Sequence, residues 1–153
     1  MLGYAVLGLL VGALINRAAN VLPQRQPLLQ SPRCPFCGRE HSPWEWIALL
    51  AYLTGRRRCS HCGAPLAVRA PLVELATAVV FAYLWRRYGP STQLALFTLY
   101  SAIFILVLVT DLEHRLILNS VMYPGIALAA VASFFRQDLH YRLALLGGLA
   151  GFL

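Results

Sequence analysis

The sequence predicts an all-α polytopic membrane protein with a small cytoplasmic insert of the zinc-ribbon type. Hydrophobic residues make up 59% of the 153 residues and charged residues only 12%, against about 25% charged in an ordinary soluble domain. The apolar residues form long blocks rather than periodic stripes, which indicates that lipid surrounds the helices. One polar segment, residues 23–69, interrupts these blocks and holds all four cysteines.

Four apolar blocks are long enough to cross a bilayer, whose hydrocarbon core of about 30 Å takes roughly 20 helical residues. We expect these four transmembrane helices at residues 1–22, 70–88, 93–110 and 116–135. A fifth block covers residues 143–153, and a helix of that length would reach only about 16 Å, half a bilayer. Residues 70–153 are therefore expected to form a truncated helical membrane domain.

Small and amide residues mark one face of the first block. Gly8 and Gly12 lie one helical turn apart, which would let a neighbouring helix approach closely. Asn16 and Asn20 also share a face, and in lipid their amides need partners inside the protein. For these amides, ordinary packing polarity and a functional role both remain open.

The arginines predict the orientation of the protein in the membrane. The net charge of +7 results from thirteen arginines and six acidic residues, and the sequence has no lysine. Seven of them lie within residues 23–69, whereas the loops on the opposite side, near residues 86–87 and 136–142, have two each. The positive-inside rule then places the cysteine segment in the cytoplasm and the N-terminus outside. A cluster between spans also argues against a nucleic-acid partner, so we expect none.

The cysteines form two C-x-x-C-G motifs. They are Cys34, Cys37, Cys59 and Cys62. Two residues between thiolates let one tight turn present both sulfurs to a tetrahedral metal, and the glycine tolerates the left-handed conformation that aims amides at sulfur. We expect a structural Zn²⁺ site, with His41 and His61 as bystanders, because a hydrolytic zinc keeps an open position. Disulfides are disfavoured on the reducing side of the membrane, and a redox C-x-x-C normally accompanies a βαβ pattern.

Two acidic residues lie at or within apolar blocks. Asp111 ends the third block, at a depth where acidic groups are costly and often functional. The alternative is that Asp111 marks the exit of the helix into water and pairs with Arg115, four residues on. Glu74, inside the second block, is either a buried partner of an arginine or part of a site.

Four stretches of the chain, in order and along essentially its whole length, resemble the prepilin peptidase (type IV leader peptidase) family. The opening helix ends in an asparagine-rich motif, and the two C-x-x-C-G motifs follow it. Two motifs similar to the family's R-Y-P-L-V-E-L and D-L-E-H come next. These stretches are Gly8 to Pro23, the two cysteine motifs, Arg69 to Leu75, and Thr110 to Asn119. Leu118 stands where the family usually has proline, and Ala13 where serine is common.

This resemblance implies a membrane aspartic endopeptidase of the bacterial inner membrane. Its substrates would be type IV prepilins or the pseudopilins of type II secretion, cleaved at the cytoplasmic face, with S-adenosylmethionine as donor for N-methylation of the new N-terminus. Asp111 would be one catalytic carboxylate, and Glu74, Glu113 and Asn16 would be accessory residues. The family's second aspartate lies in a G-x-G-D motif that residues 1–153 do not contain, so the fragment alone is expected to be inactive.

Two alternatives remain open at this point. A non-enzymatic zinc-ribbon membrane scaffold would carry the same cysteines and apolar blocks without chemistry. One half of a split peptidase would obtain its second aspartate from a separate chain. The sequence shows no glycine-rich strand-to-helix turn for S-adenosylmethionine, so methyl transfer depends on the resemblance alone.

Overall fold

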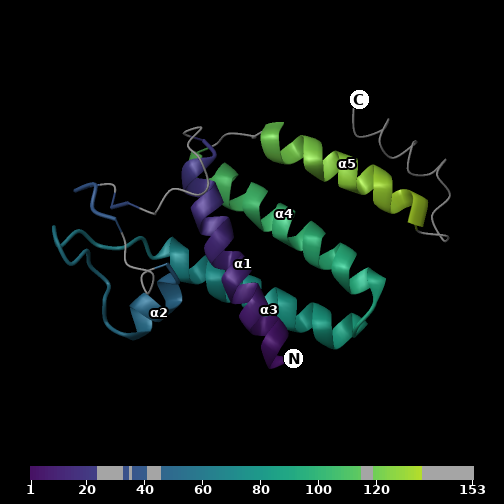
Figure 1. The fold of residues 1–153 in the computed structure, drawn as a ribbon, viewed down its shortest axis with the longest axis horizontal. Coiled ribbons are helices and arrows are strands. Elements are labelled where there is room, and N and C mark those ends of the chain that lie inside the picture. Colours follow the sequence, from purple (N-terminus) through teal and green to yellow (C-terminus); the bar gives the residue numbers. More distant parts are fainter. Residues whose placement is uncertain (24–32, 35, 41–45, 115–118, 136–153) are drawn as a thin grey trace. The chain divides into compact units, whose positions relative to one another are not determined.

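A computed structural model describes five helices in two compact units, residues 1–118 and 119–153 (Figure 1). It describes residues 1–23, 33–34, 36–40, 46–114 and 119–135. The helices are α1 (Leu2–Val21), α2 (Ala48–Leu53), α3 (Arg69–Tyr88), α4 (Thr92–His114) and, in the second unit, α5 (Asn119–Phe135). Within the described residues, the structure is thus helical apart from loops and two isolated β-bridges. The expectations for His41, Arg115, Leu118 and the fifth apolar block fall outside these residues.

The helices agree with the predicted blocks, except that α4 is longer. The predicted block ended at Thr110, but the helix continues through Asp111 to His114. Asp111 and Glu113 therefore belong to the last turn of α4 and not to a loop. The reason is local: Leu112 and Glu113 are good helix formers, and no glycine or proline interrupts the turn.

Close packing of α1 on α3 depends on Gly8 and Gly12, as the sequence predicted. A Cβ atom on Gly8 would lie 2.8 Å from the Cα atom of Ala78, and one on Gly12 would lie 2.7 Å from the Cα atom of Glu74. These distances are far below van der Waals contact, so only glycine allows the two backbones to approach this closely.

Helix α4 completes a three-helix unit with α1 and α3. At one end, the hydroxyl group of Tyr4 on α1 lies 2.7 Å from Oγ1 of Thr98 on α4, and the Tyr4 ring packs against Trp85 on α3. Nearer the other end, a small apolar core joins the three helices. It consists of Ile15, Ala19, Val73 and Val109.

Polarity in this unit is inverted relative to a water-soluble bundle. Glu74 and Thr77 of α3 are fully buried. The outward side of the same helix is a stripe of exposed apolar side chains, namely Leu72, Leu75, Val79 and Tyr83. The buried hydroxyl group of Thr77 is satisfied within its own helix by the carbonyl oxygen of Val73, at 2.7 Å. Such an arrangement suits helices whose outer surface faces an apolar solvent.

Two of the described helices, α1 and α4, are long and apolar enough to cross a membrane. Helix α3 has 20 residues but includes charged residues at both ends and Glu74 within it. Helix α5 has 17 residues. The expected count of four complete spans therefore stays a prediction.

Candidate metal centre and candidate active site

The two cysteine motifs fold into knuckles with the same backbone geometry. In each, the glycine amide donates to the carbonyl oxygen of the first cysteine, at 2.9 Å for both Gly38–Cys34 and Gly63–Cys59. The amide of that first cysteine donates to the carbonyl oxygen of the residue after the glycine, at 2.8 Å in both knuckles. Both glycines have φ of 71°, a left-handed conformation that favours glycine. The sequence prediction of two equivalent turns is confirmed.

The four sulfurs lie at the separations that a tetrahedral metal requires. The Sγ atoms of Cys34 and Cys62 are 3.7 Å apart, those of Cys37 and Cys59 are 3.8 Å apart, and all four lie within 4.8 Å of one another. Sulfurs at about 2.3 Å from a zinc ion would be about 3.8 Å apart, whereas a disulfide would need about 2.05 Å. The cluster therefore fits a metal ion such as zinc. Four thiolates would complete the tetrahedron, and His61 is exposed.

The pKa values of the thiols in the cluster differ, because their hydrogen bonds and surroundings differ. The amides of Cys62 and His61 hold the pKa of the Cys59 thiol at about 6. The amide of Ala64 lowers the pKa of the Cys62 thiol, but burial and hydrogen bonds with the other thiols outweigh it and raise that pKa to about 11. Thiolates are the form that binds metal, so a cation in the cluster would compete with protons at Cys62 in particular.

The cysteine insert is attached to the helices through Glu74. Its two carboxylate oxygens accept hydrogen bonds from the backbone amides of Ala48, at 2.8 Å, and Leu49, at 2.7 Å. These amides begin α2, where a helix has no intrahelical acceptors of its own. A second contact, from the Tyr52 hydroxyl group to the Leu66 carbonyl oxygen at 2.9 Å, ties α2 to the segment after the second knuckle. Glu74 thus caps α2.

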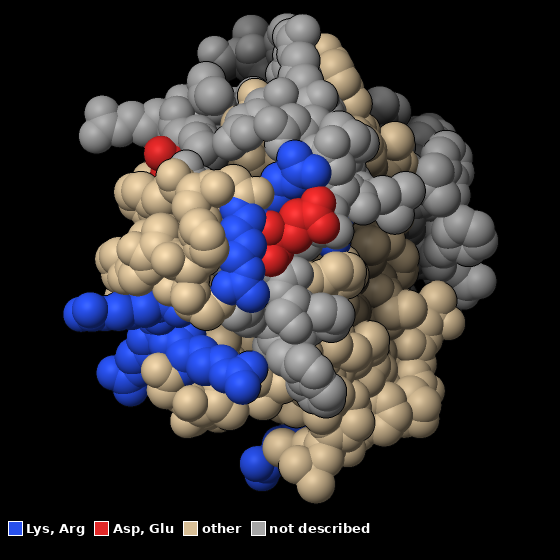
Figure 2. Space-filling view, turned by 60° about the vertical axis from the view of Figure 1, so that its left-hand side comes forward, with Lys and Arg blue, Asp and Glu red and all other residues tan. Residues whose placement is uncertain are grey.

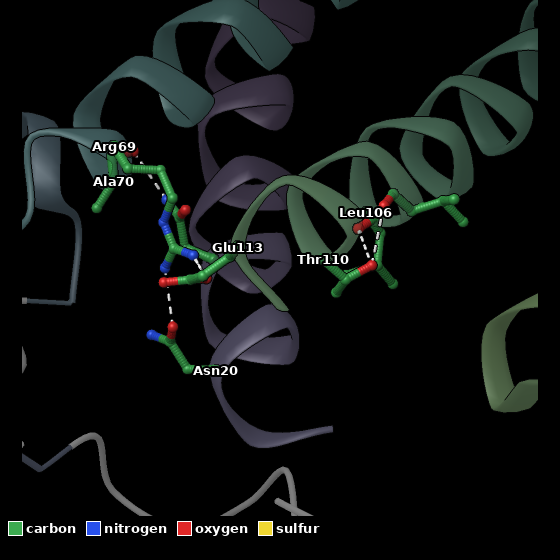
Figure 3. Close-up of polar contacts among 8 residues, drawn as sticks. Asn20, Arg69, Ala70, Leu106, Thr110 and Glu113 are labelled. Carbon is green, nitrogen blue, oxygen red and sulfur yellow. Dashed lines mark hydrogen bonds and ion pairs between the residues drawn. The ribbon is translucent and has the colours of Figure 1, made fainter. Parts of the chain in front are cut away.

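Polar side chains gather where α1 ends, α3 begins and α4 ends (Figure 3). Arg69, the first residue of α3, donates to Oδ1 of Asn20 at 2.8 Å and forms an ion pair with Glu113 of α4. The side-chain amide of Asn16 donates to the carbonyl oxygen of Ala70 at 2.8 Å. The side-chain nitrogen of Asn16 and the side-chain oxygen of Asn20 therefore have partners inside the protein, as the sequence predicted, whereas the buried Oδ1 atom of Asn16 has no hydrogen-bond partner among the described residues.

Asp111 lies exposed in the last turn of α4, two residues before Glu113. Residues two apart on a helix point about 200° apart, so Asp111 projects away from the side on which Glu113 meets Arg69. The residue before it, Thr110, is buried and donates to the Leu106 carbonyl oxygen at 3.0 Å (Figure 3). The structure therefore places Asp111 at the same end of the bundle as Asn16 and Glu113, on a different side of α4.

Sequence reasoning did not identify Arg69 as a candidate site residue. The sequence analysis treats it as one of seven arginines in a charged segment, although it contacts both α1 and α4 from the start of α3. The signal was available in its position, because Arg69 directly precedes the apolar block that contains Glu74.

The comparison with protein families matches residues 6–88 to the family described as "Bacterial Peptidase A24 N-terminal domain". This chain belongs to the prepilin peptidase A24 family. The match includes both knuckles, Arg69 and Glu74, and ends with α3. The resemblance noted from the sequence is therefore confirmed.

Several relatives are named "Prepilin leader peptidase/N-methyltransferase". The one from Myxococcus xanthus is 37% identical over 150 residues, which cover 97% of this chain and 44% of the relative. Those from Bacillus subtilis and Pseudomonas aeruginosa are 32% and 31% identical, again over 97% of this chain, and over 60% and 59% of their own lengths. The chain thus spans about half the length of these relatives. No solved structure matches it significantly.

Proposed function

We propose that this chain forms part of a membrane aspartic endopeptidase, in which Asp111 is one of two catalytic carboxylates. The observation that carries the proposal is the exposed position of Asp111 at the end of an apolar helix, within a chain of the prepilin peptidase family. Its substrates would be type IV prepilins or pseudopilins, from which it removes the leader.

Aspartic proteolysis needs two close carboxylates that share one proton. The ionised group takes a proton from water while the protonated group polarises the scissile carbonyl. The second group would come from outside residues 1–153. Glu74 accepts two amide hydrogen bonds, and Glu113 pairs with Arg69, so both acids already have structural contacts. We therefore assign these two acids, and Asn16, to support of the site rather than to catalysis.

The substitution Asp111→Asn in the full-length protein tests this assignment. It is nearly isosteric, so membrane insertion and metal content should be unchanged while leader cleavage is abolished, as mass spectrometry of a prepilin substrate would show. Glu40→Gln, an exposed acid of the insert, is the matched control and should cleave normally. Normal cleavage by the Asp111→Asn variant would refute the proposal.

We place the protein in the bacterial inner membrane with the cysteine insert in the cytoplasm. The apolar helices α1 and α4, the outward apolar stripe of α3 and the buried polar side chains support a lipid environment. Several arginine side chains lie on the face shown in Figure 2, beside a patch of acidic side chains. The exposed arginines of the insert include Arg33, Arg39, Arg56, Arg57 and Arg58. This charge suits the cytoplasmic leaflet, whose anionic lipids attract basic segments near the membrane.

The bound metal in this proposal is Zn²⁺ with a structural role, held by the four cysteines. Methylation of the new N-terminus, with S-adenosylmethionine as donor, also belongs to the proposal because the names of the relatives include N-methyltransferase. A product of the full-length protein that is one methyl group heavier, formed only when this donor is supplied, would support that second activity.

A further inference from the structure

Arg69 connects three helices at the end of the bundle that contains Asp111. It is the first residue of α3, and its guanidinium contacts Asn20 on α1 and Glu113 on α4 (Figure 3). The side chains of Arg69 and Glu113 are only 25% and 36% exposed. Water and salt therefore screen this pair less than an ion pair on an open surface.

The planar guanidinium makes this contact directional. Its donors lie in a fixed fork, so it holds two acceptors in a defined relative position, which a lysine ammonium does not do. Here one acceptor belongs to α1 and the other to α4. The last turn of α4 is thereby held against α1 and the start of α3.

The last turn of a helix needs such a contact to keep a fixed direction. Its final carbonyl groups have no intrahelical partners, so helix ends fray. Glu113 is two residues after Asp111 in this turn, and a helix rotates about 100° per residue. When Glu113 is held toward Arg69, the direction of the Asp111 carboxylate is set as well.

We propose that Arg69 is a positioning residue for Asp111, acting through its ion pair with Glu113 and its hydrogen bond to Asn20. The geometric part of the proposal concerns residues of this chain alone. Its consequence for the cleavage rate depends on the proposed function.

The direction of residue 111 can be measured without any activity. In the full-length protein with Asp111→Cys, the rate of maleimide reaction at residue 111 is followed by peptide mass spectrometry, which separates it from the native cysteines. Adding Arg69→Gln should change this rate, and adding the exchanged pair Arg69→Glu with Glu113→Arg should return it toward the original value. Arg86→Gln, which removes an exposed arginine at the other end of α3, should leave the rate unchanged. An unchanged rate with Arg69→Gln overturns the proposal.

Cleavage kinetics test the consequence for catalysis. A misplacement of about 1 Å at a catalytic group can cost about 100-fold in rate, so Arg69→Gln should lower kcat by that order while KM stays near its original value. The exchanged pair should have a higher kcat than either single variant. Metal content and elution as a single species confirm that each variant is folded.

The outcomes separate the two proposals. Normal cleavage by Asp111→Asn refutes the proposed function but leaves the labelling result intact. An inactive Asp111→Asn together with an unchanged kcat for Arg69→Gln refutes the positioning role alone. Where Arg69→Gln does not fold, the exchanged pair decides: a kcat above that of Glu113→Arg supports the proposal, and a kcat no higher than that overturns it.

Discussion

At the scale of single residues, the carboxylate of Glu74 has a structural role that the sequence did not predict. It is fully buried, and it reaches two amides 26 and 25 residues earlier in the chain. From the sequence alone, this acid inside an apolar block is either a buried partner of an arginine or part of a site. In the structure, both oxygens are engaged in capping α2, so the group holds the cysteine insert on α3.

Replacing Glu74 should therefore loosen the insert. Glu74→Ala leaves two amides without acceptors, at a cost of about 1–3 kcal/mol for each buried group, and Glu74→Gln should cost less because one oxygen remains. Hydrogen exchange across residues 46–56, followed by mass spectrometry, should be fastest in the alanine variant.

The exposed pair between Arg33 and Glu40, 3.0 Å apart, provides the control for this experiment. Such pairs contribute about 0–1 kcal/mol, so Glu40→Gln should leave exchange across residues 46–56 unchanged. Equal exchange in Glu74→Ala and the unaltered protein would show that the cap does not hold the insert.

At the scale of elements, the knuckles are two turns that a metal ion at the four cysteines would join. In the described residues, two backbone hydrogen bonds close the first turn and three close the second, where the Leu66 amide also donates to the Arg57 carbonyl oxygen. Within residues 33–40 and 58–65 the described β-structure is limited to one isolated bridge per knuckle. Between the two turns, the described side-chain contacts include one from the Arg39 guanidinium to the Ser60 hydroxyl group. Binding of zinc to four thiolates would add folding energy directly.

Removing ligands from both knuckles should therefore release the metal. Cys34→Ser with Cys62→Ser should abolish zinc content in elemental analysis of the purified protein, and His61→Ala should retain it. Zinc affinity should also fall as the pH is lowered, because protons compete for the thiolates. The pKa of the Cys62 thiol is raised to about 11 and that of Cys59 is lowered to about 6, so protons compete more strongly at Cys62 than at Cys59. Equal zinc in the double-serine variant and the unaltered protein would contradict the four-cysteine site.

At the scale of the whole molecule, the inverted polarity of the three-helix unit separates a membrane protein from a soluble one. Val79 lies near the middle of α3 and is 60% exposed. On the surface of a soluble protein, a charge at such a site would change stability by only about 0.5 kcal/mol. In the centre of a bilayer, an arginine costs about 2.5–3.5 kcal/mol by insertion scales.

Val79→Arg should therefore reduce the amount of protein recovered, correctly folded, from the membrane fraction. Leu112→Arg is the control, because Leu112 is also exposed, at 76%, but lies in the last turn of α4, where the helix would leave the membrane. Full recovery of the Val79→Arg variant would argue against a lipid-facing α3.

Features that depend on residues a few positions apart in the sequence were predictable. Cysteines and glycines three or four residues apart specify the knuckles, and Gly8 with Gly12 specifies close helix packing, because neighbours along the chain have fixed relative positions in a turn or a helix. The same holds for apolar blocks, whose length predicts helices that can span a membrane. The end of α4 was predicted less well, since polar residues after an apolar block can continue a helix as readily as end it.

The contacts between distant segments depended on how the helices meet. The partners Arg69 and Asn20 are 49 residues apart, and no local pattern states which of thirteen arginines will reach α4 or that Glu74 will face α2. Those pairings arise because α1, α3 and α4 pack with one particular rotation, a property of all three surfaces together. A site whose residues lie within a few positions of one another, such as the cysteine motifs, can be predicted from the sequence. The direction in which Asp111 points is set only when the helices pack.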